Sequence, residues 1–151
     1  MENKIPGEAE VHHTLLPMHS DPVGTTVPPC KLYSGVEFTA KKMGNCLANS
    51  YVRIDLENYF KQDKIYYKFA DETVTPAYTL LNVGVGSDIM CKGKTLFSIY
   101  IYAHNVTDVA YQSNMSRFKY GDPNNVTGRT GVYEMGRNIG FKINVPIDFK
   151  K

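Results

Sequence analysis

Apolar and polar residues alternate with a period of two over five stretches of the chain, which is typical of β-strands with one apolar face. The stretches span residues 31–41, 50–60, 77–89, 96–106 and 138–149. In the second stretch the charged residues Arg53, Asp55 and Glu57 alternate with apolar ones. Helical geometry would scatter such a charged row around the helix axis, so we predict strands. No stretch shows the 3.6-residue period of an amphipathic helix.

The last of these stretches alternates almost to the C-terminal residue, although chain termini usually fray. One face of the expected strand is apolar, with Ile139, Phe141, Ile143, Val145, Ile147 and Phe149. The residues between them are Asn138, Gly140, Lys142, Asn144, Pro146 and Asp148. We therefore predict a regular strand that runs from 138 to 149.

The segments between and before the strands predict the topology. The first thirty residues are rich in Pro, His, Gly and Glu and have no sustained period, so we predict a loop or irregular segment at 1–30. Residues 31–149 then form an all-β antiparallel meander of about five long strands. Short glycine-containing turns follow the first and third strands, and long polar connections at 61–76 and 107–129 follow the second and fourth. This alternation predicts one smooth rim and one elaborated rim.

The length of the strands favours a membrane sheet over a soluble one. Soluble strands usually have about five or six residues, whereas membrane-crossing strands need about nine to eleven. Aromatic residues also gather where strands meet connections, as in the girdles of membrane barrels. These residues are Tyr59, Phe60, Tyr66, Tyr67, Phe69 and Tyr78. The alternative is a soluble antiparallel sheet, which alternates in the same way over one buried face.

Five strands cannot close a membrane barrel. Bacterial single-chain barrels have about 8 strands or more, and an open sheet in lipid leaves two edges of unsatisfied backbone groups. We therefore expect this chain to be part of a transmembrane β-barrel whose other strands lie elsewhere. The first twenty residues have neither a basic start nor an apolar core, so we expect no signal peptide, in agreement with a fragment.

Composition adds few constraints. The formal net charge of +2 gives no electrostatic case for a nucleic-acid partner. No run approaches the roughly 18 apolar residues of a membrane helix. The cysteines Cys30, Cys46 and Cys91 include no CxxC pair, and free thiols are favoured over a disulfide between the last two.

Candidate chemistry is sparse, so we expect no enzymatic role, no cofactor and no metal. The cluster His12, His13, His19 and Asp21 offers metal-binding side chains, but loop histidines without a framework are usually only polar residues.

Two further features have structural interpretations. Asp55 and Glu57 share a strand face with Arg53, which favours a solvated polar row over the converging acid pair of a glycosidase. Gly84 and Gly86 lie inside a strand, where glycine permits bending or close approach.

Four motifs occur in order along the second half of the chain. They are "YTLLNVGVGSDI" at 78–89, "NVTDVAY" at 105–111, "GRTGVYEMGRNI" at 128–139 and the alternating end that reaches Phe149. Together they resemble the C-terminal strands of TonB-dependent outer-membrane receptors, and "LPMHSDP" at 16–22 resembles an earlier segment of that family. The resemblance covers residues 15–149. Lys150 and Lys151 follow Phe149, whereas the family usually ends at the aromatic residue.

The resemblance implies a barrel of about 22 strands around a plug domain. Such receptors lie in the outer membrane of the cell and import iron chelates, such as siderophores or haem, or similar large nutrients. The implied partners are outer-membrane lipid, the missing plug domain and barrel strands, the TonB energy-transducing complex and the barrel assembly machinery.

The resemblance and the alternation together assign side chains to two faces. The lumen side takes Arg53, Asp55, Glu57, Asn82, Tyr100, Tyr102, Lys142 and Asn144. The lipid side takes Val52, Ile54, Leu56, Leu81, Val83, Val85, Phe97, Ile99, Ile101, Ile139, Phe141, Ile143 and Val145. The assembly signal would be Val145, Ile147 and Phe149, and connections 61–75 and 107–130 would be extracellular. The alternative function is a soluble β-sandwich module that binds a ligand such as carbohydrate on a platform of Tyr51, Tyr59, Tyr66 and Tyr67.

Overall fold

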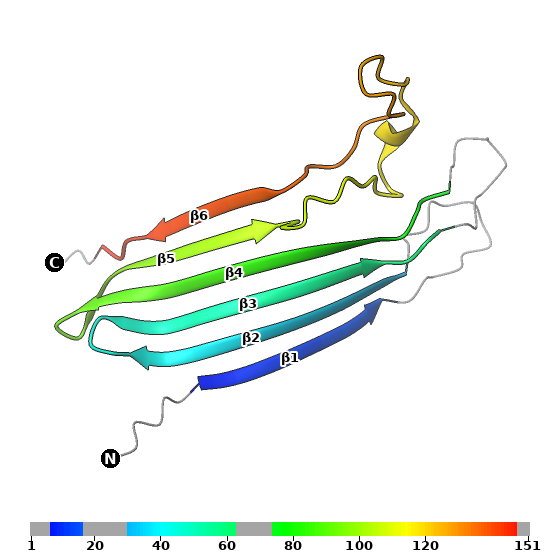
Figure 1. Cartoon of the computed structure of the whole chain (residues 1–151). Coiled ribbons are helices and arrows are strands. Elements are labelled where there is room, and N and C mark those ends of the chain that lie inside the picture. Colours follow the sequence, from blue (N-terminus) through cyan, green and yellow to red (C-terminus); the bar gives the residue numbers. More distant parts are fainter. Residues whose placement is uncertain (1–6, 17–29, 63–73, 148–151) are drawn as a thin grey trace.

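The computed structural model describes residues 7–16, 30–62 and 74–147 (Figure 1). These residues form six strands and one short 3-10 helix: β1 Gly7–Leu16, β2 Lys31–Met43, β3 Leu47–Tyr59, β4 Tyr78–Cys91, β5 Lys94–His104, η2 Arg117–Tyr120 and β6 Asn138–Asn144. The strands make a single antiparallel sheet in sequence order, from β1 to β6. The predicted all-β meander is therefore confirmed, with one strand more than expected.

The additional strand, β1, corrects the prediction that residues 1–30 are wholly irregular. It pairs along its whole length with β2, and Val11 lies opposite Val36. Its sequence hides the period because His13 stands where an apolar residue would continue the pattern. The His13 ring nitrogen Nδ1 lies 3.1 Å from the Ser34 Oγ, so the histidine is hydrogen-bonded across the two strands.

The terminal strand is shorter than predicted. β6 ends at Asn144, which pairs with Ser98, and residues 145–147 continue outside the ladder. Pro146 has no backbone N–H to donate, which disfavours a longer ladder on an edge strand. Phe149 and the two lysines after it lie outside the described residues.

The two rims of the sheet differ as the connection lengths predict. Tight turns join β2 to β3 and β4 to β5, and each uses a glycine with positive φ, Gly44 at 68° and Gly93 at 79°. The strand ends that lead into the long connections all lie at the opposite rim, and β1 begins and β6 ends at the rim of the tight turns (Figure 1). The structure thus confirms a smooth rim and an elaborated rim.

The pairing register sorts the strand residues into a polar face and an apolar face. Arg53 lies opposite Gly84, which lies opposite Tyr102, so all three share one face. All eight residues predicted to face the lumen lie on this polar face: Arg53, Asp55, Glu57, Asn82, Tyr100, Tyr102, Lys142 and Asn144.

The apolar face is uncovered within the described residues. The two buried hydrophobic residues of the described part, Ala48 and Leu80, both lie on the polar face. On the apolar face, Phe141 is 78% exposed and Ile143 is 55% exposed. The other large exposed side chains on this face are Val11, Leu15, Phe38, Val52, Ile54, Leu56, Ile101 and Ile139. Among the described residues, no helix has the length and apolar character needed to cross a membrane.

Polar pairs bound the apolar face at both rims. The Oγ atoms of Ser50 and Ser87 lie 2.8 Å apart near the tight turns. Near the long connections, the Thr79 hydroxyl donates a 2.8 Å hydrogen bond to the Asn58 Oδ1. The apolar side chains of β3 and β4 therefore form a band of limited height.

Candidate functional site

The first polar cluster on the polar face is built around Asp55. Arg53 Nε donates hydrogen bonds to both carboxylate oxygens, at 3.0 and 2.8 Å, and the Tyr33 hydroxyl donates to Oδ1 at 2.5 Å. The Arg53 guanidinium also donates to the Tyr33 hydroxyl. Gly35 is the residue opposite Asp55 on β2, and a Cβ there would lie 2.6 Å from the carboxylate oxygen. The charge of Asp55 is thus fully partnered.

The second polar cluster is built around Glu57. Lys31 Nζ lies 2.5 Å from Oε2, and the Tyr59 hydroxyl donates to the same oxygen at 2.9 Å. Asn82 Nδ2 donates to Oε1 at 2.8 Å, and Asn82 Oδ1 accepts the backbone N–H of Asn105 at 3.0 Å. This chain of contacts ties β2, β3 and β4 to the start of the long connection after β5.

These two clusters agree with the polar-row interpretation of the strand. A glycosidase pair needs one carboxylic acid able to donate a proton and a second, free carboxylate. Asp55 is held by Arg53 and Glu57 by Lys31, so each carboxylate has its own cation. The arrangement neutralises charge on a half-buried surface and gives no acid–base pair.

A column of three tyrosines stands beside the second cluster. The Tyr59 and Tyr78 rings stack with centroids 4.5 Å apart, and Tyr78 stacks on Tyr111 at 4.6 Å. Lys31 Nζ lies 4.9 Å from the Tyr59 centroid. Burial in this column raises the pKa of the Tyr111 hydroxyl.

The tyrosine column corrects the expected aromatic girdle. Tyr59 and Tyr78 are opposite each other on β3 and β4, and both lie on the polar face with Glu57. A girdle at a membrane surface would lie on the apolar face. Phe60, another member of the expected girdle, is exposed and does not belong to the column. The remaining members, Tyr66, Tyr67 and Phe69, lie outside the described residues.

Strand glycines on the polar face accommodate tyrosine rings. A Cβ on Gly86 would overlap the rings of Tyr51 and Tyr100, whose centroids are 6.3 Å apart. A Cβ on Gly140 would overlap the ring of Tyr102. The prediction that glycine permits close approach in this strand is therefore confirmed at Gly86.

The motif "NVTDVAY" forms a compact turn at the end of β5. Asn105 has a positive φ of 50°, its Oδ1 accepts the N–H of Val109 at 2.9 Å, and its Nδ2 donates to the Val109 carbonyl at 2.9 Å. Asp108, with φ of 56°, accepts the N–H of Arg137 at 2.8 Å. Asn and Asp tolerate this left-handed conformation better than other side chains, which explains both residues.

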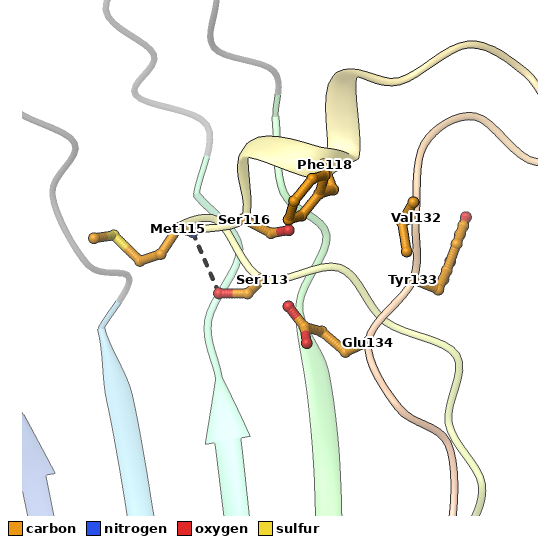
Figure 2. A pocket seen from close by; sticks show the side chains of 7 residues that line it. All are labelled: Ser113, Met115, Ser116, Phe118, Val132, Tyr133 and Glu134. Atoms are coloured by element: carbon orange, nitrogen blue, oxygen red, sulfur yellow. Dashed lines mark hydrogen bonds between the residues drawn. The ribbon is translucent and has the colours of Figure 1, made fainter.

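Two pockets flank this turn. A polar pocket of about 230 Å³ lies on the polar face and includes Glu57, Tyr59, Asn82, His104 and Tyr111 in its lining. A larger pocket of about 640 Å³, called here the loop pocket, lies within the connection between β5 and β6 (Figure 2). Its lining residues are Ser113, Met115, Ser116, Phe118, Val132, Tyr133 and Glu134.

Other candidate residues are spread apart. His12 and His13 are neighbours on β1 and so point to opposite faces, while His19 and Asp21 lie outside the described residues. No group of three metal-binding side chains occurs in the described ranges.

The three cysteines all lie in the described ranges, whereas the proposed assembly signal is described only in part. Cys30, Cys46 and Cys91 are free thiols. Val145 and Ile147 are exposed, at 58% and 69%, and their proposed partner Phe149 lies beyond the described residues.

Several important side chains were absent from the sequence prediction. Lys31 and Tyr33 lie at the start of β2, and only the register with β3 brings them to Glu57 and Asp55. Tyr111 reaches the tyrosine column from a connection with no period. One signal was available in the sequence. Lys31 and Tyr33 occupy alternate positions of the strand, with Leu32 and Ser34 at the positions that follow them, and so belong to its polar face.

Comparison with protein families, with curated proteins and with solved structures gives no match for this chain.

Proposed function

We propose that this chain is part of an outer-membrane β-barrel of the TonB-dependent receptor class, which imports iron chelates or similar large nutrients. One observation carries the proposal. A single sheet of long strands has an apolar face that the described residues leave uncovered, and an opposite face whose polar side chains bind one another. Lipid would cover the apolar face, and a lumen with its plug would cover the polar face. The motif resemblance supplies the receptor class.

The dimensions of the apolar band support a lipid partner. From Ser50 to Asn58, the polar boundaries of the band, β3 rises about 26 Å at about 3.3 Å per residue. A strand tilt of about 40° reduces this height to about 20 Å, near the apolar band of about 25 Å in outer-membrane barrels. The tight turns at one rim and long connections at the other are also typical of those barrels.

The open edges support a larger assembly. β1 and β6 each pair with one strand only, so each has one edge of unpaired backbone groups within the described sheet. In lipid each unsatisfied group costs several kcal/mol, so further strands of the same barrel would have to pair there. The proposal therefore includes the missing strands, the plug domain, the TonB complex and the barrel assembly machinery as partners.

The alternative β-sandwich module has less support. A sandwich covers its apolar face with a second sheet, whereas the described residues form one sheet. Its sugar platform would use Tyr59, whose ring already contacts Tyr78 and Lys31. The alternative therefore remains only as an outcome of the test.

The test is insertion of the full chain into lipid vesicles, with charge placed on one face or the other. Ile101→Lys and Ile143→Lys put lysine on the apolar face, and Asn144→Lys puts it on the polar face of the same strand region. We expect each apolar-face lysine to cost about 2–4 kcal/mol of insertion free energy and the control to cost about 0–1 kcal/mol. Protease protection after flotation measures insertion.

Equal insertion of all three variants and the parent chain would reject a lipid-facing surface. A chain that stays monomeric in water without detergent and melts cooperatively would instead favour the soluble module.

A further inference from the structure

The loop pocket is lined by apolar side chains that are largely exposed. Phe118 is 71% exposed and Val132 is 61% exposed, although they stand on opposite walls of the same pocket (Figure 2). We propose that the loop pocket binds a small molecule with an aromatic or apolar body and a cationic amine head. The ligand class does not depend on the proposed function. Only the side of the membrane that the pocket would face rests on it.

The walls of the pocket are cross-linked by backbone hydrogen bonds. Val132 N donates to the Phe118 carbonyl at 2.9 Å, and Glu134 N donates to the Tyr111 carbonyl at 2.9 Å. Gly131, with φ of 70°, makes this approach possible, because a Cβ there would lie 2.5 Å from the Lys119 carbonyl carbon. The pocket is therefore formed before a ligand arrives, which lowers the entropy cost of binding.

The η2 wall is also anchored to a second connection. Lys119 is buried, and its Nζ donates to the Thr75 Oγ1 at 3.1 Å and the Asn114 Oδ1 at 3.3 Å. Thr75 belongs to the connection between β3 and β4, where it forms a bridge with Gln62. Residues from two long connections thus hold η2 and its neighbours in place.

The lining chemistry specifies the ligand class. The volume of about 640 Å³ falls in the range of about 300–1,000 Å³ that small-molecule sites occupy. Phe118 and Tyr133 supply ring faces and edges, and aromatic rings attract cations as well as apolar groups. The hydroxyl groups of Ser113 and Ser116 can accept hydrogen bonds from an amine.

Glu134 supplies the only charge among the seven lining residues. Figure 2 shows its side chain on the lower side of the pocket, below Ser113. Its side chain is exposed, so a ligand can reach the carboxylate. Arg129 lies 5.1 Å from the Tyr133 ring but is not a lining residue, so it supports that ring without occupying the pocket.

The test compares three probes of nearly equal shape on the full chain in a non-ionic detergent. The probes are phenethylamine, phenethyl alcohol and phenylacetate, which differ in the charge of the head group. Saturation-transfer NMR, recorded at increasing probe concentration, gives the apparent affinity of each probe. A probe that only partitions into the detergent is recognised because its signal does not saturate with concentration. We expect phenethylamine to bind at least about tenfold more tightly than the alcohol, and phenylacetate to bind least.

Matched variants locate the effect. Glu134→Gln removes the lining charge and should abolish the preference for the amine, while Asp122→Asn removes an exposed charge of the same connection outside the pocket and should leave it. Phe118→Ser should weaken all three probes together. Equal binding of the probes, absence of saturable binding, or an equal effect of the two charge variants overturns the proposal.

The result is separable from that of the membrane test. A chain that shows the amine preference but inserts equally well with lysine on either face would remove the membrane function and leave the pocket assignment. A chain that inserts but shows no amine preference would reject the pocket alone.

Discussion

Asp108 accepts a hydrogen bond from the backbone N–H of Arg137 at 2.8 Å, across 29 residues of chain. The contact joins the turn at the end of β5 to the residue that immediately precedes β6. It therefore fixes the point at which the long connection returns to the sheet. Gly136 makes room for it, because a Cβ there would lie 2.6 Å from the Asp108 carboxylate oxygen.

Replacement of Asp108 should loosen β6 more than the rest of the sheet. Asp108→Ala removes the acceptor and also places alanine at a φ of 56°, so we expect a loss of about 1–3 kcal/mol in local stability. Asp108→Asn keeps an acceptor and a side chain that tolerates this φ, so its effect should be smaller. Hydrogen exchange of the β6 amides measures the difference. Equal exchange in both variants would contradict this role of the side chain.

The two strand glycines of β4 give a matched pair. Gly86→Ala should destabilise the sheet by about 1–3 kcal/mol, since the new Cβ overlaps the rings of Tyr51 and Tyr100. Gly84→Ala should be neutral or slightly stabilising, because its nearest neighbour, Tyr51 Cε2, would lie at 3.9 Å. Urea unfolding of the chain in detergent compares the two midpoints. Similar midpoints would show that the rings move aside without cost.

The ion pair of Lys31 and Glu57 should be energetically coupled. Both side chains are partly buried, at 24% and 18% exposure, and Glu57 also accepts from Asn82. Lys31→Met leaves the carboxylate without its cation, whereas the double variant with Glu57→Gln removes both charges. We expect a coupling of about 1 kcal/mol in a double-mutant cycle, since partial solvent exposure screens the pair. Additive effects would assign the pair no energetic role.

The buried amine of Lys119 should hold two connections together. Lys119→Met removes the donor to Thr75 and Asn114 while keeping much of the side-chain volume. We expect faster proteolysis of the connections between β3 and β4 and between β5 and β6, with the sheet itself unchanged. Limited proteolysis followed by mass spectrometry maps the new cleavage sites. Cleavage confined to the second connection would contradict a link between them.

The sequence predicted the faces of the strands well, because side-chain direction in a strand depends only on parity. Arg53, Asn82 and Lys142 were placed on one face from the alternation of their own strands, and the register confirms it. The same alternation carried no information on which side chains contact one another across the strands. Glu57 was expected to be part of a solvated row, whereas Lys31 and Asn82 enclose it from the two neighbouring strands.

Prediction failed where local pattern and tertiary pairing disagree. β1 was missed because His13 breaks its apolar side, and its pairing with β2 compensates for that break. The tyrosine girdle was misassigned because position near a strand end does not specify a face. Tyr78 is the first residue of β4 and lies opposite Tyr59, so both rings lie on the polar face of the sheet. The loop pocket has no periodic signal, since backbone hydrogen bonds between distant residues create it.

The placement of both strand ends at the rim of the tight turns has a consequence for how such a sheet can change in size. A unit of six antiparallel strands that starts and finishes at one rim can be added to a longer sheet, or taken from it, without reversing the direction of any flanking strand. Every neighbouring side chain would keep its face, and every long connection would keep its rim. Within a longer sheet, such a meander would therefore be exchangeable as one piece.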